Sequence, residues 1–190
     1  MAKLYSIDGK APAIDPDAFV HPDAVLIGDV RIGPGCYIGP CACLRGDFGR
    51  IRLEAGAIVQ DTCVIHTFPD QEVLIETGGL LGHGAVIHGC TIKKNALVGI
   101  NAVVLDKAVV GENSLVAAGA LVPAGKEIPA NKLAAGVPAK VIRMLTEPEI
   151  DRKLEGLRMY QTLAVRSLKT MRPVKRNSAH DNQPRRRRNV

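Results

Sequence analysis

The sequence predicts an all-β solenoid, a parallel β-helix of hexapeptide repeats, followed by one C-terminal α-helix. Three observations support this fold. An aliphatic residue recurs with a six-residue period over residues 18–122, a small residue precedes most of these positions by two, and aromatic residues make up 3% of the chain, with no Trp. The aliphatic positions are Val20, Leu26, Ile32, Ile38, Leu44, Leu53, Val59, Ile65, Leu74, Leu80, Val86, Ile92, Val98, Val104, Val110, Val116 and Val122.

The period indicates how these residues pack. Side chains two apart on a strand face the same way, so the aliphatic residue and the small residue before it both point inward. Cys36, Cys63 and Cys90 take the small position and are expected in the core. Three extra residues interrupt the period at two places, between Leu44 and Leu53 and between Ile65 and Leu74. The 17 repeats, three to a coil, predict between five and six coils.

The remaining segments follow from composition. Residues 1–17 are expected to form an N-terminal strand and cap, 18–122 the β-helix, and 123–145 an exit segment that leaves it. A helix is predicted over 146–171, because Thr146 and Glu149 match a capping box, with Pro148 in the first turn. Residues 172–190, with Arg185–Arg188, are predicted to be a disordered basic tail.

Charge and cysteine usage limit the partners. The net charge of +6 is the charge of residues 172–190 alone, and no aromatic residue interrupts Arg185–Arg188, so a nucleic-acid partner is not expected. No run of about 18 apolar residues is present, which argues against a membrane span. The five Cys form no C-x-x-C pair. These features predict a cytoplasmic protein in a reducing compartment.

Three histidines, His66, His83 and His88, predict a metal site, because neutral imidazole is the commonest metal ligand in proteins. The repeat places His66 and His88 on one edge of the prism, where coils about 4.8 Å apart allow them to share an ion. His83 falls on a different edge. In a threefold assembly that edge faces a neighbour, so we expect a homotrimer with metal at its interfaces. Zn²⁺ is the expected ion, with Fe²⁺ or Co²⁺ as alternatives.

At this point the motifs resemble the γ-class carbonic anhydrase family, and within it the branch of carnitine- and phenylacetate-operon proteins. The motifs are Arg45-Gly46-Asp47, Gln60-Asp61, His66, Gly82-His83-Gly84 and His88-Gly89-Cys90. The resemblance implies a left-handed β-helix trimer with His66, His83 and His88 as metal ligands. It also implies a thioesterase that acts on a CoA thioester in aromatic-ring (phenylacetate) catabolism, using a metal-bound hydroxide.

The resemblance also implies roles for the polar neighbours. Gln60 would orient the metal-bound water, and Arg45, Asp47 and Asp61 would form the interface network that holds the site. A purely structural role, as ion pairs between subunits, is the alternative for those three residues. Phe48 stands where the founding carbonic anhydrase has a glutamate, and the loop over residues 68–72 is short, so the resemblance does not extend to the proton route that efficient CO₂ hydration needs.

Three other functions fit the same sequence. Hydration of CO₂ to bicarbonate would keep the site and change the reaction. A hexapeptide acyltransferase would use a catalytic histidine without a metal. A trimeric scaffold would bind metal without turnover. Metal analysis and substrate assays separate these alternatives, with a small-molecule substrate expected in all but the last.

Overall fold

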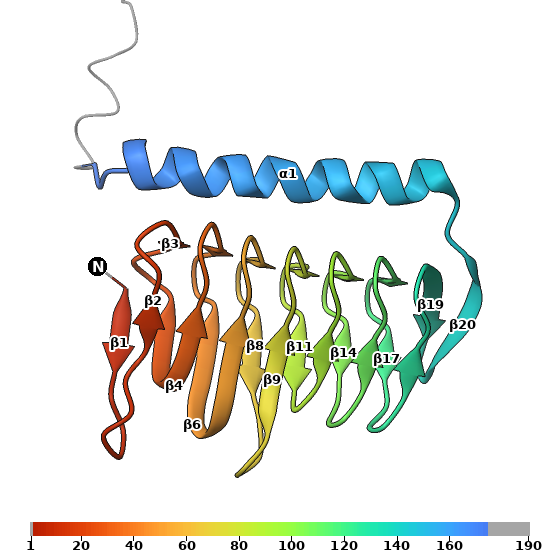
Figure 1. Cartoon of the computed structure of the whole chain (residues 1–190), viewed down its shortest axis with the longest axis horizontal. Coiled ribbons are helices and arrows are strands. Elements are labelled where there is room, and N and C mark those ends of the chain that lie inside the picture. The colour runs from red at the N-terminus through yellow and green to blue at the C-terminus, as the bar shows by residue number, and fades with distance from the viewer. Residues whose placement is uncertain (1, 175–190) are drawn as a thin grey trace, which may run out of the picture.

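Triangular coils stacked into a prism make up most of the chain, and one long helix lies along one face (Figure 1). The computed structural model describes residues 2–174. Its helix is α1 (Glu147–Thr170), and its strands are β1 (Lys3–Tyr5), β2 (Ala13–Ile14), β3 (Phe19–Val20), β4 (Val25–Ile32), β5 (Tyr37–Ile38), β6 (Cys43–Leu53), β7 (Ile58–Val59), β8 (Val64–His66), β9 (Glu72–Ile75), β10 (Leu80–Leu81), β11 (Val86–His88), β12 (Thr91–Ile92), β13 (Leu97–Val98), β14 (Val103–Val104), β15 (Val109–Val110), β16 (Leu115–Val116), β17 (Leu121–Val122), β18 (Glu127–Ile128), β19 (Lys132–Gly136) and β20 (Ala139–Met144).

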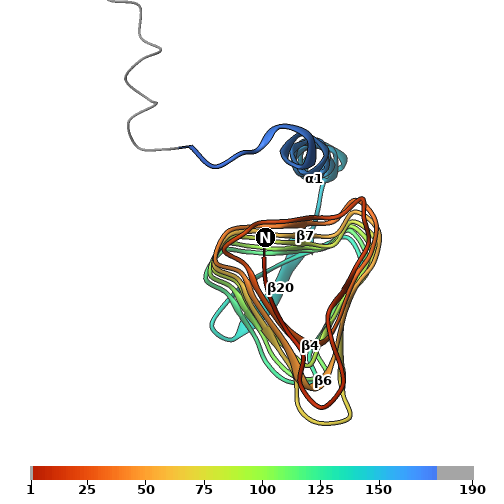
Figure 2. The ribbon, with the colours of Figure 1, turned by 90° about the vertical axis from the view of Figure 1, so that its left-hand side faces the viewer.

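The strands form the three faces of a triangular prism, each built of parallel strands and seen end on in Figure 2. The first face holds β1, β8, β11, β14, β17 and the first halves of β4 and β6, and the second holds β2, β9, β12, β15, β18 and their second halves. The third face holds β3, β5, β7, β10, β13, β16 and β19, with β20 antiparallel at its end. Each parallel strand therefore pairs with strands one coil away, as the predicted β-helix requires.

The solenoid is longer than the sequence predicted. About seven coils are present in residues 2–174, because β1 and β2 pair with β4, β18 pairs with β15, and β19 pairs with β16. The expectation that residues 123–145 leave the solenoid is wrong for most of that segment. The six-residue spacing continues from Val122 to Ile128 and Ala134, both fully buried, while Pro123 and Pro129 lie in turns that need no strand N–H.

The inward register also differs in one region. The structure buries Ile75, Leu81 and Ile87 completely, in place of the predicted Leu74, Leu80 and Val86. Val86 is 37% exposed on the outside, and Leu80 packs under α1. The error arose because aliphatic residues stand side by side at all three places, and the chain between Ile65 and Ile75 is one residue longer than the predicted break.

The cysteines at the small inward positions lie in the core as predicted. Cys36, Cys63 and Cys90 are buried and unpaired. Burial raises the pKa of Cys36 and Cys63 to about 11 and that of Cys90 to about 12. Thiolate is the reactive form of cysteine, so these three thiols are packing residues at neutral pH.

The helix α1 runs along the third face, and its apolar stripe covers that face as expected. Leu157 and Ala164 are buried there in one cluster with Phe19, Tyr37, Ile58 and Leu80. At its start the Thr146 backbone N–H donates to Glu149 Oε2 at 2.9 Å, which is one of the two hydrogen bonds of a capping box. Hydrogen bonds from Arg143 and from the Thr146 backbone lower the pKa of Glu149 to about 2.

The predicted tail lies almost wholly beyond this structure. Residues 175–190, with Arg185–Arg188, are outside the described residues. Within residues 2–174, no helix combines the length and the apolar character that a membrane crossing needs.

Candidate metal site at two edges of the first face

A row of five polar side chains follows the corner between the first and second faces. Arg45 Nη1 donates to Asp47 Oδ2 at 3.1 Å, and Asp47 Oδ1 lies 2.9 Å from His66 Nε2. His66 Nδ1 lies 3.3 Å from His88 Nε2, and His88 Nδ1 lies 2.7 Å from Asp106 Oδ1. The structure therefore brings Arg45, Asp47, His66 and His88, four of the predicted site residues, together in one line of close polar contacts.

Strand register brings the two histidines together. β8 and β11 pair in parallel, with His66 opposite His88 at the last position of each strand. Both side chains point outward, because Ile65 and Ile87 just before them point into the core. Phe48 packs against the ring of His66, and Phe68 packs edge-on against the ring of His88.

Two glycines allow Asp47 to reach this row. Gly46 lies against the backbone of the previous coil, where an added Cβ would stand 2.5 Å from the Asp29 carbonyl oxygen. Gly28 has a positive φ of +75°, and a Cβ added there would collide with the Gly46 carbonyl oxygen. Only glycine fits both places. The three residues added to the period between Leu44 and Leu53 therefore lie at this corner as part of the continuous strand β6.

The carboxylates on the outer nitrogens favour one tautomer of each imidazole. A neutral imidazole carries one N–H. When His66 donates it to Asp47 and His88 donates it to Asp106, both nitrogens at the 3.3 Å contact are bare acceptors. Two acceptors at this distance repel unless a proton or a metal ion lies between them. Ring orientation by a carboxylate on the outer nitrogen is the usual second shell of a histidine metal ligand.

The distance itself fits a shared ion. Two nitrogen ligands at about 2.0–2.1 Å from a tetrahedral zinc ion lie about 3.3 Å from each other. The 3.3 Å between His66 Nδ1 and His88 Nε2 matches that separation. Within residues 2–174 of one chain, however, no group of three or more His, Cys, Asp or Glu side chains could hold a metal ion. A metal ion between these two rings would therefore need a further donor from outside the described residues of one chain.

His83 lies at the opposite edge of the first face, as the repeat predicted. Its Nδ1 lies 3.3 Å from Asp61 Oδ2, and its backbone N–H donates to Gln60 Oε1 at 3.0 Å. The Tyr160 hydroxyl reaches its Nε2 at 3.4 Å. Gln60 is buried, and the bond to His83 uses its carbonyl oxygen, which leaves its NH₂ group for another partner. The predicted residues thus form two clusters in one chain.

The first face between the two clusters is apolar on the outside. His83 precedes strand β11 and His88 ends it, so the clusters flank this face. Its outward row is only partly covered, and Val64 and Val86 are 40% and 37% exposed. The row runs through Cys43, Val64, Val86, Val103 and Leu121 on successive coils.

Two residues of the site were missed by the sequence analysis. Asp106 lies one coil beyond His88, where the period alone could have placed a carboxylate beside it. Tyr160 contributes from α1, 77 residues away from His83 in the chain. No local pattern signals that contact, because it depends on how α1 docks.

Comparison with known proteins agrees with this fold. The family model "Bacterial transferase hexapeptide (six repeats)" matches residues 12–46 and 89–124. The carnitine operon protein CaiE of Salmonella dublin is 47% identical over 184 residues, covering 95% of this chain and 92% of the relative. The predicted resemblance to proteins of the carnitine operon is thereby confirmed.

Solved structures of this family superpose closely. A proposed acetyltransferase of Bacillus cereus matches with a TM-score of 0.86 at 35% identity, covering 88% of this chain and 97% of that one. A hexapeptide transferase family protein of Anaplasma phagocytophilum matches with a TM-score of 0.82 at 38% identity, covering 85% of this chain and 96% of that one. The chain therefore belongs to the bacterial hexapeptide-repeat transferase family, as a homologue of the carnitine operon protein CaiE.

Proposed function

We propose that this protein is a metal-dependent hydrolase of acyl-CoA thioesters and works as a homotrimer. The observation that carries the proposal is the 3.3 Å separation between His66 Nδ1 and His88 Nε2, with Asp47 and Asp106 against the outer nitrogens of the two rings. In the tautomers in which each ring donates to its carboxylate, both facing nitrogens have a lone pair for a metal ion. Zn²⁺ is the ion we expect, and Fe²⁺ or Co²⁺ would suit the same imidazole donors. The third ligand is His83 of a neighbouring copy.

The first face supplies the surface for that trimer. It carries His66 and His88 at one edge, His83 at the other, and an apolar, partly exposed row between them. A threefold arrangement that packs this face against the next copy would bring the two edges of different copies together. It would also bury the exposed rings of Phe48 and Phe68, which lie against the paired histidines.

The chain's own residues have separate tasks in this proposal. Asp47 and Asp106 hold the rings of His66 and His88 in one tautomer, and Asp61 does the same for His83. The free NH₂ group of Gln60 is placed to hold the attacking water or the thioester oxygen. A bound divalent ion would supply Lewis-acid activation of water and of the thioester carbonyl at neutral pH.

The substrate class rests on the resemblance to operon proteins that handle CoA thioesters. We propose a thioester of aromatic-ring (phenylacetate) catabolism, and the carnitine operon relatives make carnitine-derived acyl-CoAs the second set to assay. Acyl transfer is a second candidate reaction, favoured by the family to which the chain belongs. It would use His83 as a base and need no metal.

Metal content and turnover test the proposal together. Protein purified without oxygen should contain about one divalent ion per chain by elemental analysis. It should hydrolyse members of a panel of aryl, ring-derived and carnitine-derived acyl-CoAs. His66→Ala and His88→Ala should lose metal and turnover together, while His21→Ala, whose ring contacts only Asp23 among carboxylates of residues 2–174, should keep both.

Each rival has its own outcome in the same experiments. Full turnover after chelation would contradict the metal mechanism and favour acyl transfer, which transfer assays with amine and hydroxyl acceptors would then detect. Rapid CO₂ hydration in a stopped-flow pH assay would assign a carbonic anhydrase. Metal without turnover of any substrate would leave a trimeric scaffold.

A further inference from the structure

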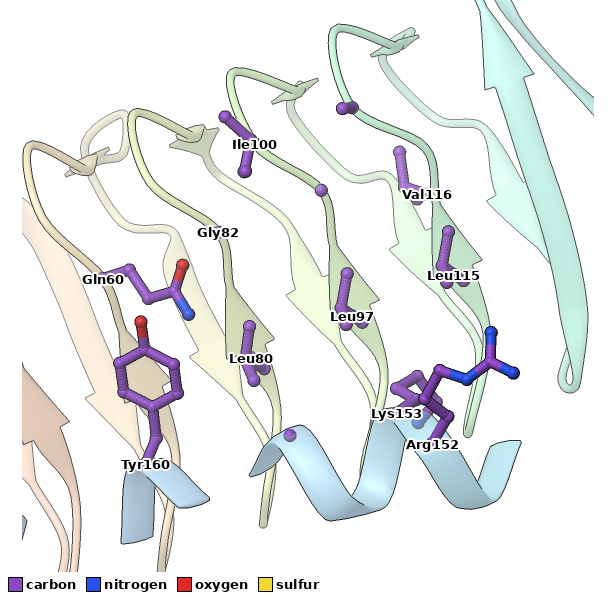
Figure 3. A pocket seen from close by; sticks show the side chains of 13 residues that line it. Gln60, Leu80, Gly82, Leu97, Ile100, Leu115, Val116, Arg152, Lys153 and Tyr160 are labelled. Atoms are coloured by element: carbon purple, nitrogen blue, oxygen red, sulfur yellow. The ribbon is translucent and has the colours of Figure 1, made fainter. Parts of the chain in front are cut away.

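A trough of about 410 Å³ lies between α1 and the third face (Figure 3), and Tyr160, which lines it, contacts His83. We call it the helix trough. Its floor is the outward leucine row Leu80, Leu97 and Leu115, one wall is α1, and the other wall is the turn edge that carries Gln60, Gly82 and Ile100. A volume in this range is typical of small-molecule sites.

The packing of α1 explains where the trough begins. The outward row of the third face is buried under the helix at Phe19, Tyr37, Ile58 and Leu80. Further along the prism Leu97 and Leu115 are only partly covered. Apolar floor therefore remains open at the half of the face that lies near the start of the helix.

Gly156 keeps the trough open from the helix side. It lies in the middle of α1, where glycine costs about 0.5–1 kcal/mol relative to alanine. A Cβ added at Gly156 would meet no atom of this structure within 4 Å. Nothing within the described chain therefore requires glycine here, and the space it leaves belongs to the trough that Gly156 lines.

The two ends of the trough differ chemically. At one end the Tyr160 hydroxyl contacts His83, beside Gln60. At the other end Lys153 and Arg152 line the trough, and neither forms an ion pair with a carboxylate of residues 2–174. Lys153 is only 8% exposed, and its ammonium group has one acceptor, the Asn95 carbonyl oxygen. A buried cation with unused donors favours an anionic partner.

The distance between the two ends of the trough is close to the length of one acyl chain. Tyr160 and Lys153 are seven positions apart on α1, which corresponds to about 10 Å along the helix axis. An acyl chain of about eight carbons, at roughly 1.2 Å per bond, spans a similar length. The thioester carbon would then lie near His83 and the far end of the chain near Lys153.

We propose that the helix trough binds the acyl group of the substrate, and that this group carries a carboxylate at the end remote from the thioester. The inference rests on the proposed function, since it places the thioester at the His83 end. Apolar carbons of the acyl chain lie over the leucine floor, and the terminal carboxylate accepts hydrogen bonds from Lys153 and Arg152.

Binding without turnover tests the trough independently of hydrolysis. The monomethyl ester of suberate and the methyl ester of octanoate, called suberate and octanoate below, carry an uncharged ester in place of the thioester and differ only in the remote carboxylate. Calorimetry on the full-length protein measures the binding of both. Suberate should bind about tenfold tighter, as one charge-assisted hydrogen bond provides. Lys153→Met should remove that preference, whereas Arg158→Met, an exposed charge on α1 outside the trough, should keep it.

Filling the trough gives a second, steric readout. Gly156→Leu should weaken both ligands at least tenfold, while the matched variant Glu155→Leu, exposed on the same helix, should not. Gly156→Ala should raise the melting temperature, since it removes the helix cost of glycine, and should weaken binding less than leucine does. Circular dichroism confirms that each variant is folded.

The outcomes distinguish this inference from the function on which it rests. Equal binding of suberate and octanoate, or unchanged binding in Gly156→Leu, would overturn the trough even if thioesters are hydrolysed. Selective binding of suberate with no thioesterase activity would support the trough and reject the proposed function. Binding of 4′-phosphopantetheine, but not of suberate, with loss in Lys153→Met would assign the cationic end to the CoA arm and overturn the acyl assignment. A changed oligomeric state of Gly156→Leu in sedimentation would also overturn it, because a neighbouring copy would then occupy the trough.

Discussion

His66 and His88 face each other across neighbouring coils, with Nδ1 of one ring 3.3 Å from Nε2 of the other. Their register follows from β-strand pairing, and their orientation follows from Asp47 and Asp106 on the outer nitrogens. Both features are present in a single chain. His83, at the other edge of the same face, is held by Asp61 and Gln60 in a separate cluster. The division of ligands between two edges leads to the first prediction.

Mixed trimers should restore activity in one combination of inactive variants. His66→Ala and His83→Ala should each be inactive alone, because every interface lacks one ligand. When they are refolded together at equal amounts, about a quarter of the interfaces pair an intact His66–His88 edge with an intact His83 edge. Thioesterase activity should therefore return to about a quarter of the wild-type value.

The matched control is the mixture of His66→Ala with His88→Ala. Both residues belong to the same edge, so no interface in that mixture regains a complete set. Recovery in both mixtures, or in neither, would contradict a site shared between copies.

The carboxylate behind His88 should control metal affinity. Asp106→Asn keeps the size of the side chain and removes the charge that fixes the His88 ring at 2.7 Å. Metal affinity should fall about 10- to 100-fold, measured by competition with a chelating dye. Asp23→Asn removes the carboxylate beside His21 and serves as the control. An Asp106→Asn protein with wild-type affinity would show that Asp106 is only a surface partner of His88.

The sequence predicted the solenoid and the two-edge division of the site, because both depend on a period that survives single substitutions, and it predicted the C-terminal helix from its capping box and apolar spacing. It failed where two neighbouring residues were equally suitable for the core. Val86 and Ile87 are both aliphatic, and only the length of the preceding loop decides which one points inward. Correcting this register puts His88 directly after an inward residue, equivalent to His66, which strengthens the pairing that the sequence predicted.

Contacts that depend on where α1 packs against the solenoid could not be predicted from the sequence. The Tyr160 hydroxyl beside His83, and the trough beside Gly156, depend on where α1 lies on the third face. The apolar residues of α1 indicated that it covers a face but not which one. Likewise Asn95, the acceptor for Lys153, lies 58 residues away in the chain, on a turn without a distinctive motif.

The corrected register gives a prediction that separates folding from assembly. Ile87→Ala removes a fully buried side chain and should destabilise the fold by about 2–5 kcal/mol in urea unfolding. Val86→Glu puts a charge on the outward row of the first face. It should leave the circular dichroism spectrum intact but convert the trimer to monomers in sedimentation velocity, because an unpaired charge would be buried at the interface.

A trimer that survives Val86→Glu would show that the first face is not the interface. Thr91→Glu, at an outward position of the second face, is the control that should leave the trimer intact.

The pH dependence of stability should report the charge on Lys153. Burial lowers the pKa of Lys153 to about 8, from 10.5 for the unfolded chain. Below pH 8 the folded protein carries the full cost of a buried ammonium. Between about pH 8 and 10.5 the unfolded chain binds more protons than the folded one, so this contribution makes stability rise with pH, by about 3 kcal/mol in total.

Two tyrosines change stability in the opposite direction near and above pH 10. Burial raises the pKa of Tyr37 and Tyr160, so their contribution falls as pH rises. The quantity to measure is therefore the difference in unfolding free energy between wild type and Lys153→Met, by urea at several pH values and one protein concentration. That difference should shift in favour of the wild type between pH 8 and 10.5. The same comparison with Arg158→Met, an exposed residue of α1 outside the trough, is the control and should stay flat. A constant difference for Lys153→Met would mean that its ammonium is paired or solvated in the folded protein, which would remove the anion preference expected at that end of the helix trough.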